Sequence, residues 1–298
     1  MCIRDSDEIA QLIGSLDEDE VEDDDFDLTA ALEAAAFVER GDIWTVGRHR
    51  LVCGDATNAG DIELLMDGKK ANLVLTDPPY NVAFESSDGL SIKNDKMSAD
   101  AFYEFLLAAF TQMAGVCEKG ASAYVFHADT EGLNFRRAFQ DAGFKLSGCC
   151  IWVKDSLVLG RSPYQWQHEP VLYGWVKTGK HTWYADRKQT TVWRFDKPRR
   201  NADHPTSKPL DLLAYPIGNS TQANAIVLDT FAGSGSTLMA CEATNRIAYC
   251  MELDEKYASV ILRRYADATG DAAGITCLRD GQQLAYLDVV KAVDRGKK

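Results

Sequence analysis

The chain of 298 residues has no apolar run approaching the 18 residues that span a membrane. Its start has no apolar segment that would direct secretion, and no stretch rich in proline, glycine and serine separates two domains. The eight cysteines are scattered, without a C-x-x-C pair or a histidine cluster at metal-ligand spacing. These absences predict a cytoplasmic protein with reduced thiols, no membrane segment and no metal site.

Acidic residues dominate the net charge of −13, but they are unevenly distributed. Residues 1–40 carry 14 acidic and two basic residues, whereas residues 41–298 carry 31 acidic and 30 basic ones. The acidic run 18–25 repels itself, so we expect residues 1–40 to form a disordered leader and 41–298 to form the folded domain. The leader could mimic DNA, bind a partner or be a solubilising remnant, and its removal is expected to preserve activity.

Apolar periodicity in the remaining chain predicts alternating strands and helices. The expected strands are 43–46, 49–53, 73–76, 123–126, 151–153, 170–176, 225–228, 247–251 and 276–278. The expected helices are 28–38, 60–67, one capped by Ser98, 130–142, 236–244 and 254–267. A helix after Pro209 should kink or end at Pro216. Such alternation predicts an α/β fold with a mostly parallel sheet.

Polar clusters follow four of the expected strands: Asp55, Asp77 to Tyr80, Asp229 to Thr237, and Glu252. Ligands of open α/β sheets bind beyond the carboxyl ends of the strands. The four clusters therefore predict a single site at that edge of the sheet.

The segment Asp77-Pro78-Pro79-Tyr80 has the groups needed to activate an aromatic amine. The lone pair of such an amine is delocalised into the ring, and acceptors for both amine hydrogens draw the nitrogen toward tetrahedral geometry. The Asp77 carboxylate and the Pro78 carbonyl are two such acceptors, held by consecutive prolines of fixed φ. The Tyr80 ring offers a face on which an extruded base can stack. Alternatively, the segment is a rigid turn with Tyr80 in the core.

Glycines in the segment 229–237 indicate a loop that approaches a ligand closely. Gly233 and Gly235 permit a tight turn between a strand and a helix. A dinucleotide site is the main alternative, but Leu238 occupies the third glycine position of G-x-G-x-x-G. Glu252 could bond the ribose hydroxyls of either a nicotinamide cofactor or S-adenosylmethionine, so it does not decide between them.

The ordered set of motifs resembles the beta group of DNA amino-methyltransferases over roughly residues 41–270. The motifs that carry this resemblance are Gly54-Asp55, Asp77 to Tyr80, His168-Glu169-Pro170, His204 to Pro209, and Phe231 to Gly235. The resemblance implies a Rossmann-like, circularly permuted S-adenosylmethionine-dependent methyltransferase fold with a mostly parallel seven-stranded sheet and helices on both faces. It also implies a bacterial or phage enzyme near the nucleoid that acts on double-stranded DNA, either within a restriction-modification system or as an orphan methylase, with a homodimer as one option.

The resemblance also implies roles for individual residues. Asp77, Pro78, Pro79 and Tyr80 would hold the target base. The cofactor would be bound by Asp229, Phe231, Ala232, Gly233 and Gly235 around its methionine and ribose, Glu252 at the ribose hydroxyls, Asp55 at the adenine amino group, and Thr206 and Lys208 near the methionine carboxylate. His168 and Glu169 are open between a structural hydrogen-bonding role and substrate contact.

Basic and aromatic residues are interleaved in the segment 177–208, which carries nine Lys or Arg against three Asp. This pattern is typical of a nucleic-acid contact, and we expect a target-recognition segment over about 177–203. The candidate DNA-binding residues are Lys180, Arg187, Lys188, Arg194, Lys197, Arg199 and Arg200, beside the aromatic residues Trp183, Tyr184, Trp193 and Phe195. The alternative is a solvated basic loop with its aromatic residues in the core.

The predicted reaction is methylation of adenine N6 in DNA. The base would be flipped out of the duplex, and its amine would attack the sulfonium methyl directly and in line, without a covalent enzyme intermediate. The Asp-Pro-Pro-Tyr form favours adenine by resemblance, and cytosine N4 is the alternative substrate. More distant alternatives are a nicotinamide-dependent oxidoreductase and a DNA-binding regulator that has lost activity.

Overall fold

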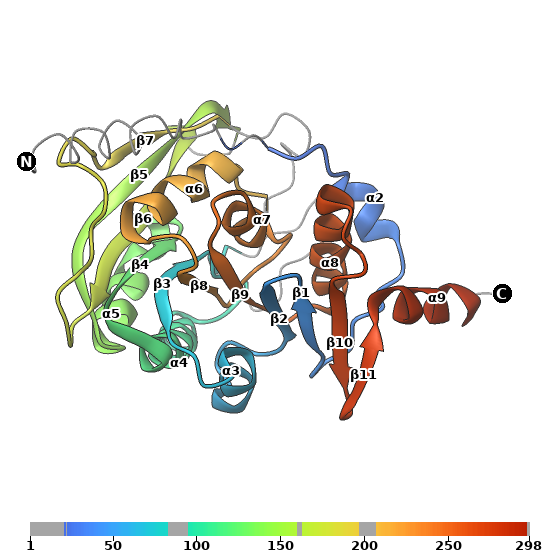
Figure 1. The fold of residues 1–298 in the computed structure, drawn as a ribbon. Coiled ribbons are helices and arrows are strands. Elements are labelled where there is room, and N and C mark those ends of the chain that lie inside the picture. Colours follow the sequence, from blue (N-terminus) through green and yellow to red (C-terminus); the bar gives the residue numbers. More distant parts are fainter. Residues whose placement is uncertain (1–20, 22, 83–94, 160–162, 197–206, 297–298) are drawn as a thin grey trace, which may run out of the picture.

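The computed structural model describes residues 21, 23–82, 95–159, 163–196 and 207–296 (Figure 1). The strands of this part are β1 (Ile43–Val46), β2 (His49–Cys53), β3 (Ala71–Thr76), β4 (Cys117–Phe126), β5 (Phe144–Val158), β6 (Trp166–Val176), β7 (Val192–Arg194), β8 (Ile226–Asp229), β9 (Ile247–Glu252), β10 (Ile275–Arg279) and β11 (Gln282–Ala285). The α-helices are α2 (Leu28–Glu33), α3 (Ala59–Met66), α4 (Ala99–Val116), α5 (Gly132–Asp141), α6 (Leu210–Ser220), α7 (Ser236–Ala243), α8 (Glu255–Thr269) and α9 (Tyr286–Gly296).

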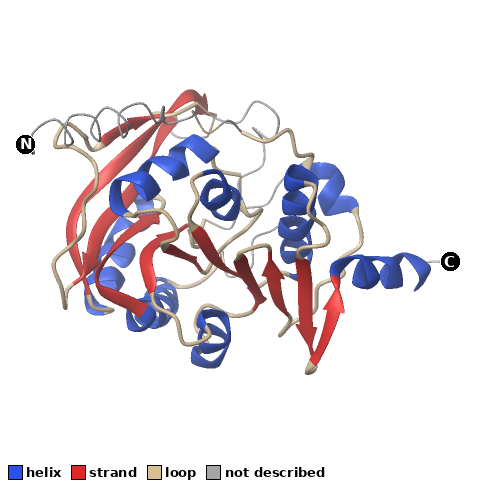
Figure 2. Cartoon of the chain, in the orientation of Figure 1, coloured by secondary structure: helices blue, strands red, loops and turns tan. Residues whose placement is uncertain are grey.

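The described strands form one sheet in the order β11-β10-β1-β2-β9-β8-β3-β4-β6-β5-β7 (Figure 2). Strands β2, β9, β8, β3 and β4 are parallel neighbours. The α/β class is confirmed, but the seven-stranded, mostly parallel sheet is wrong in detail, because the sheet has 11 strands. The additional strands come largely from hairpins, whose short connections force antiparallel pairing on both flanks.

Helices cover both faces of the sheet, as expected. Side chains that alternate along β3 enter two separate cores: Leu73 and Leu75 pack with residues of α6, α7 and α8, whereas Val74 packs with residues of α3, α4 and α5. Successive side chains of a strand point to opposite faces of its sheet, so a strand buried on both sides contributes to two cores in this way. The β3 strand therefore lies in the middle of a three-layer body, and its carboxyl end is held rigidly.

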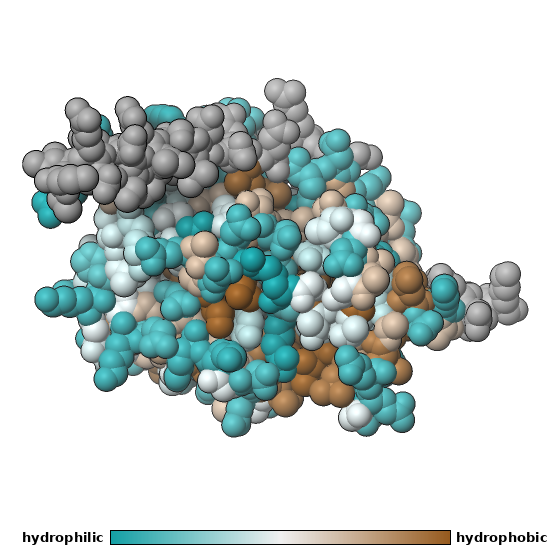
Figure 3. Space-filling view, in the orientation of Figure 1, coloured by the Kyte–Doolittle hydropathy of each residue, from teal (hydrophilic) through white to brown (hydrophobic). Residues whose placement is uncertain are grey.

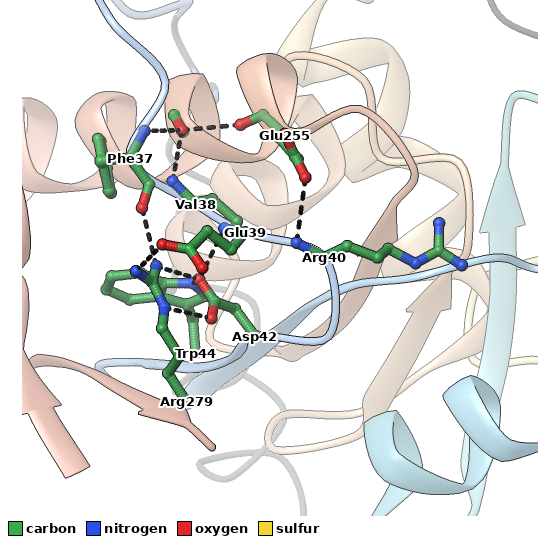
Figure 4. A network of polar contacts seen from close by, with 9 residues as sticks. Phe37, Val38, Glu39, Arg40, Asp42, Trp44, Glu255 and Arg279 are labelled. Atoms are coloured by element: carbon green, nitrogen blue, oxygen red, sulfur yellow. Dashed lines mark hydrogen bonds and ion pairs between the residues drawn. The ribbon is translucent and has the colours of Figure 1, made fainter. Parts of the chain in front are cut away.

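The ordered body begins before residue 41, which corrects the expected domain boundary. Phe37 and Val38 are buried, and their backbone N–H groups donate to Ser259 Oγ at 3.0 and 3.1 Å. Arg279 bonds the Asp42 carboxylate and the Phe37 carbonyl (Figure 4). Burial and these contacts outweigh the charge repulsion that we expected to keep the segment unfolded. Removal of residues 1–40 would expose part of the core, whereas residues 1–20 and 22 lie outside the described part.

The helix start that was predicted at Ser98 is correct, whereas a helix end at Pro216 is not. Ser98 caps α4, as predicted, with its Oγ accepting from the Ala101 N–H at 3.4 Å. In contrast, α6 continues through Pro216. Pro216 and Ile217 are both buried, and this burial offsets the hydrogen bond that a proline removes.

The surface of the described residues is mixed in polarity. On the face shown in Figure 3, hydrophobic atoms gather near β10 and β11, where Leu278 of β10 is 43% exposed. No helix among the described residues has the length and apolar character that crossing a bilayer requires.

Candidate active site

The four polar clusters meet at one cavity of about 190 Å³. Each cluster follows a parallel strand: Asp55 follows β2, Asp77 to Tyr80 follow β3, Asp229 to Gly233 follow β8, and Glu252 ends β9. These strands are consecutive in the order β2-β9-β8-β3. Because parallel strands end at the same edge, side chains up to 197 positions apart in the sequence line the same space.

The Asp-Pro-Pro-Tyr turn places Asp77 and Tyr80 in direct contact. The Tyr80 hydroxyl donates to Asp77 Oδ1 at 2.6 Å and lies 3.1 Å from Glu169 Oε2. Pro78 and Pro79 also line the cavity. The Tyr80 hydroxyl therefore fixes the orientation of the Asp77 carboxylate, a role that the sequence did not indicate.

Lys208 completes a buried ionic network around Asp77. Its Nζ lies 2.6 Å from Asp77 Oδ2 and 3.2 Å from Glu169 Oε2, and Lys154 Nζ lies 2.5 Å from Glu169 Oε1. Only 7% of the Lys208 side chain is exposed. The expectation for Lys208 was a contact with a cofactor carboxylate, whereas the structure pairs it with two carboxylates of the chain itself.

Charge and burial act in opposite directions in this network. Burial, with Glu169 nearby, raises the pKa of Asp77 although the Lys208 ammonium opposes the shift. Burial alone would raise the pKa of Glu169, but the nearby Lys208 and Lys154 ammonium groups lower it to about 2. Burial likewise opposes the charge of Lys208, yet Asp77 and Glu169 raise its pKa above the ordinary value. Glu169 and Lys208 are therefore charged at neutral pH.

The glycine loop between β8 and α7 contacts Glu252 of β9 and Ile261 of α8. Gly233 and Gly235 have φ of 52° and 85°, the left-handed region that glycine adopts without strain. The Gly233 N–H donates to Glu252 Oε2 at 2.8 Å. A Cβ on Gly235 would lie 3.1 Å from Ile261 of α8, so Gly235 permits close packing beneath the loop.

Two carboxylates that line the cavity have raised pKa values. Burial raises the pKa of Glu252 to about 7, although backbone N–H groups of Asp254 and Gly233 oppose the shift. Burial also raises the pKa of Asp229 to about 6, against hydrogen bonds from the Thr237 and Thr76 hydroxyls and the Phe231 N–H. A ligand that donates hydrogen bonds to Glu252 would favour its ionised form.

Thr230 is a site residue that sequence reasoning missed. Among the described residues, its buried Oγ1 has no hydrogen-bond partner, and the residue lines the cavity. A buried hydroxyl without a partner is costly, so it fits a ligand with polar groups at that position. Asp55 is also at the cavity, where its Oδ1 accepts from the Thr57 N–H and Oγ1.

The predicted cofactor residues mostly line this cavity. The lining includes Asp55, Asp229, Phe231, Ala232, Gly233, Glu252 and Lys208. Gly235 is at the end of the loop, where it packs against Ile261 and is not part of the lining, and Thr206 lies outside the described residues. The described residues contain no group of three or more His, Cys, Asp or Glu arranged to hold a metal ion.

Two described cations of the basic segment, Lys180 and Arg194, lie near opposite ends of the neighbouring strands. The Lys180 carbonyl packs against Gly120, near the start of β4, whereas Phe126 at the other end of β4 lines the cavity. Six residues of strand separate these ends by roughly 20 Å. Arg194, in contrast, pairs with Val153 of β5. The residue before Val153, Trp152, is the cross-strand partner of Glu169 on β6.

The described residues of the segment differ in their exposure to solvent. Lys180, Arg187, Lys188 and Arg194 are exposed, whereas Lys197, Arg199 and Arg200 lie outside the described residues. Trp193 is 4% exposed and packs against Tyr124 and Tyr215, so this aromatic residue belongs to the core. Trp183 and Tyr184 are 36% and 49% exposed.

An α/β sheet with an Asp-Pro-Pro-Tyr turn beside a glycine loop defines a class of methyltransferase, and the comparisons with known proteins agree. The DNA methylase family model matches residues 71–263. The Escherichia coli (strain K12) protein named "Putative methylase YubD" is 30% identical over 208 residues, covering 70% of this chain and 86% of that protein. The chain therefore belongs to the DNA methylase family, and the resemblance found in the sequence is confirmed.

Other relatives and structures are similar at lower identity. The DNA adenine methyltransferase YhdJ of Escherichia coli (strain K12) is 28% identical over 229 residues, covering 66% of this chain and 76% of that protein. The M1.HpyAVI–SAM complex has a TM-score of 0.54 at 22% identity, covering 72% and 98% of the two chains. The cytosine-N4-specific PvuII DNA methyltransferase has a TM-score of 0.58 at 15% identity, covering 83% and 94%.

Proposed function

We propose that this DNA methylase transfers the methyl group of S-adenosylmethionine to the N6 amine of adenine in double-stranded DNA. The observation that carries the proposal is the joint position of Asp77, Pro78 and the glycine loop on one cavity. An acceptor pair for an aromatic amine thus lies beside a loop that a cofactor can approach.

The cavity has features that fit S-adenosylmethionine. Glu252 would accept hydrogen bonds from the ribose hydroxyls, and Asp55 from the adenine amino group. The Thr230 hydroxyl would find there the partner that it lacks among the described residues. When bound, the cofactor would supply an electrophilic methyl group on sulfur. The M1.HpyAVI structure, which was solved with SAM, supports this choice of cofactor.

Asp77 and Pro78 would prepare the base. The extruded adenine would stack on Tyr80 and donate its two amine hydrogens to the Asp77 carboxylate and the Pro78 carbonyl. Asp77 and Pro78 would orient the amine toward the methyl group that the cofactor supplies, and the Asp77 carboxylate would accept the proton that the amine loses on methylation. Positioning and preorganised charge would supply most of the rate enhancement.

Lys208 and Glu169 would keep this acceptor in place. Two ammonium groups and two carboxylates alternate from Lys154 through Glu169 and Lys208 to Asp77. Such a chain holds Asp77 in a fixed orientation before the base arrives, which saves reorganisation during the reaction.

Adenine is proposed over cytosine on two observations. The turn begins with Asp, the form that the sequence resemblance associates with adenine, and the similar protein YhdJ is a DNA adenine methyltransferase. Cytosine N4 is the second candidate, because a cytosine-N4-specific enzyme shares the fold. Both amines would fit the same pair of acceptors. A homodimer stays a prediction.

The decisive experiment identifies the modified base. The full chain is expressed in a host without DNA methylation, and the genomic DNA is digested to nucleosides for mass spectrometry. N6-methyladenine is expected, and it should be missing from a host that expresses the Asp77→Ala variant. N4-methylcytosine would overturn the adenine assignment while leaving the reaction class intact.

A further inference from the structure

Arg264 of α8 joins the acidic N-terminal segment to the glycine loop. Its Nε lies 2.6 Å from Asp24 Oδ2, and its Nη2 donates to Asp24 Oδ1 at 3.0 Å. On the other side, its Nη1 donates to the Ser234 carbonyl and to Ser236 Oγ, both at 3.1 Å. The Arg264 side chain is 4% exposed. One buried guanidinium thus connects a carboxylate of residues 1–40 with the loop and the first turn of α7.

Asp23, the neighbouring residue, bonds the start of α6, an element that carries one residue of the cavity lining. Its Oδ1 accepts from the Leu210 N–H at 2.8 Å, at the first residue of α6, whose N-cap residue Pro209 makes no side-chain hydrogen bond. A carboxylate at this end satisfies a free N–H group and interacts favourably with the helix dipole. Lys208, two residues before Leu210, and Leu213, three residues after it, both line the cavity.

The acidic pair is itself anchored to the body. Leu28, Ala31 and Leu32 of α2 are buried and form a small core with Val260 of α8. The Asp27 side chain caps α2 by accepting from the Ala30 N–H at 3.0 Å. The contacts of Asp23 and Asp24 are therefore backed by a docked helix on α8, the helix that also carries Arg264.

We propose that Asp23 and Asp24 form a strap that fixes the start of α6 and the glycine loop, and that Arg264 is a positioning residue for cofactor binding. The strap rests on the proposed function, since it assumes that the cavity binds S-adenosylmethionine. Arg264 bonded to Asp24 keeps the Ser234 carbonyl, and with it the loop 231–235, in one conformation. Without Asp24 the buried guanidinium loses the carboxylate that bonds its Nε and Nη2, a costly state that favours movement of Arg264 away from the loop.

The test compares Asp24→Asn with Glu33→Gln in the full chain. Both changes remove one negative charge near α2, but Glu33 is exposed and has no role at the cavity. Calorimetry with S-adenosylmethionine should give about a tenfold weaker Kd for Asp24→Asn, equal to about 1.4 kcal/mol. The KM for the cofactor should rise to match, while kcat changes less than about twofold, since the reacting groups are untouched. Glu33→Gln should match the wild type.

A purely structural role would give a different result, because it would lower the melting temperature without changing cofactor affinity in the folded protein. Unchanged affinity of Asp24→Asn, measured well below its melting temperature, therefore overturns the strap. If Asp24→Asn does not fold, the double variant Asp24→Leu/Arg264→Met removes both charges and avoids an unpaired buried ion. It should also bind the cofactor more weakly, and wild-type affinity would refute the proposal. A wild-type protein that does not bind S-adenosylmethionine would instead overturn the proposed function, and the strap with it.

Discussion

The Lys208 ammonium lies 2.6 Å from Asp77 Oδ2, although 131 positions separate the two residues in the sequence. The other Asp77 oxygen accepts from the Tyr80 hydroxyl. Both oxygens of the proposed amine acceptor are thus already bonded within the protein. An incoming base would share these oxygens with Lys208 and Tyr80. These two residues would therefore determine the orientation of the Asp77 carboxylate relative to the amine.

Lys208→Met is expected to lower kcat while leaving cofactor affinity within about threefold of the wild type. Loss of a hydrogen bond to a charged group typically costs about 1.5–3 kcal/mol, which corresponds to roughly a tenfold to hundredfold fall in rate. Steady-state kinetics and calorimetry measure the two quantities separately. A large loss of cofactor affinity with unchanged kcat would instead place Lys208 at the methionine carboxylate.

Asp77→Ala is expected to reduce turnover by at least about two orders of magnitude, the scale for losing one preorganised transition-state contact. Cofactor affinity should stay nearly normal, because the glycine loop and Glu252 are unchanged. Transfer of a radiolabelled methyl group to DNA measures turnover. Methylation at nearly the wild-type rate would show that the Asp-Pro-Pro-Tyr turn is not the catalytic centre.

Tyr80 has two separable functions in the proposed site, and a pair of variants distinguishes them. Tyr80→Phe keeps the ring but removes the hydroxyl that bonds Asp77, so kcat should fall while the stacking of the base persists. Tyr80→Ala removes both and should in addition weaken capture of the base by roughly 1–3 kcal/mol. The fluorescence of 2-aminopurine at the target position reports extrusion of the base. Equal loss of extrusion in both variants would contradict a stacking role.

Cofactor affinity is expected to fall as the pH drops below about 7, because of Glu252. Burial raises the pKa of this carboxylate to about 7. Ribose hydroxyls that donate to Glu252 favour its charged form, so the bound state has the lower pKa and acid opposes binding. The effect is at most about tenfold per pH unit for one proton. Calorimetry on the wild type and Glu252→Gln isolates this contribution, and an equal slope in both would exclude Glu252 as its origin.

The position of the site could be predicted from the sequence, because it depends on local patterns. Each of Asp55, Asp77, Asp229 and Glu252 ends a short apolar strand, and the rule for open α/β sheets brings such ends together. The network of Lys154, Glu169 and Lys208 could not be predicted in this way. Its contacts depend on side chains from distant elements, and no spacing in the sequence encodes them.

The N-terminal segment shows how charge can obscure a folding signal. Leu28, Ala31 and Leu32 have the spacing of an amphipathic helix and are buried against α8. The sequence predicted a helix over 28–38, but the surrounding acidic residues suggested that the leader as a whole is disordered. Asp24 is compensated by Arg264, which lies 240 residues later, and no local pattern reveals this partner.

The basic segment predicts different effects for two of its cations. Arg194 pairs with Val153 of β5, next to Lys154 of the ionic network, whereas Lys180 lies near the start of β4, about 20 Å from the cavity end of that strand. Arg194→Ala is expected to weaken binding of all DNA sequences alike and to reduce the salt dependence of log Kd by about one phosphate contact. Lys180→Ala, which also removes one exposed positive charge, is the matched control and should change neither quantity. Fluorescence anisotropy over a series of salt concentrations measures both. Equal effects of the two variants would mean that DNA follows the whole segment, and the reverse order would place the duplex at the far end of β4.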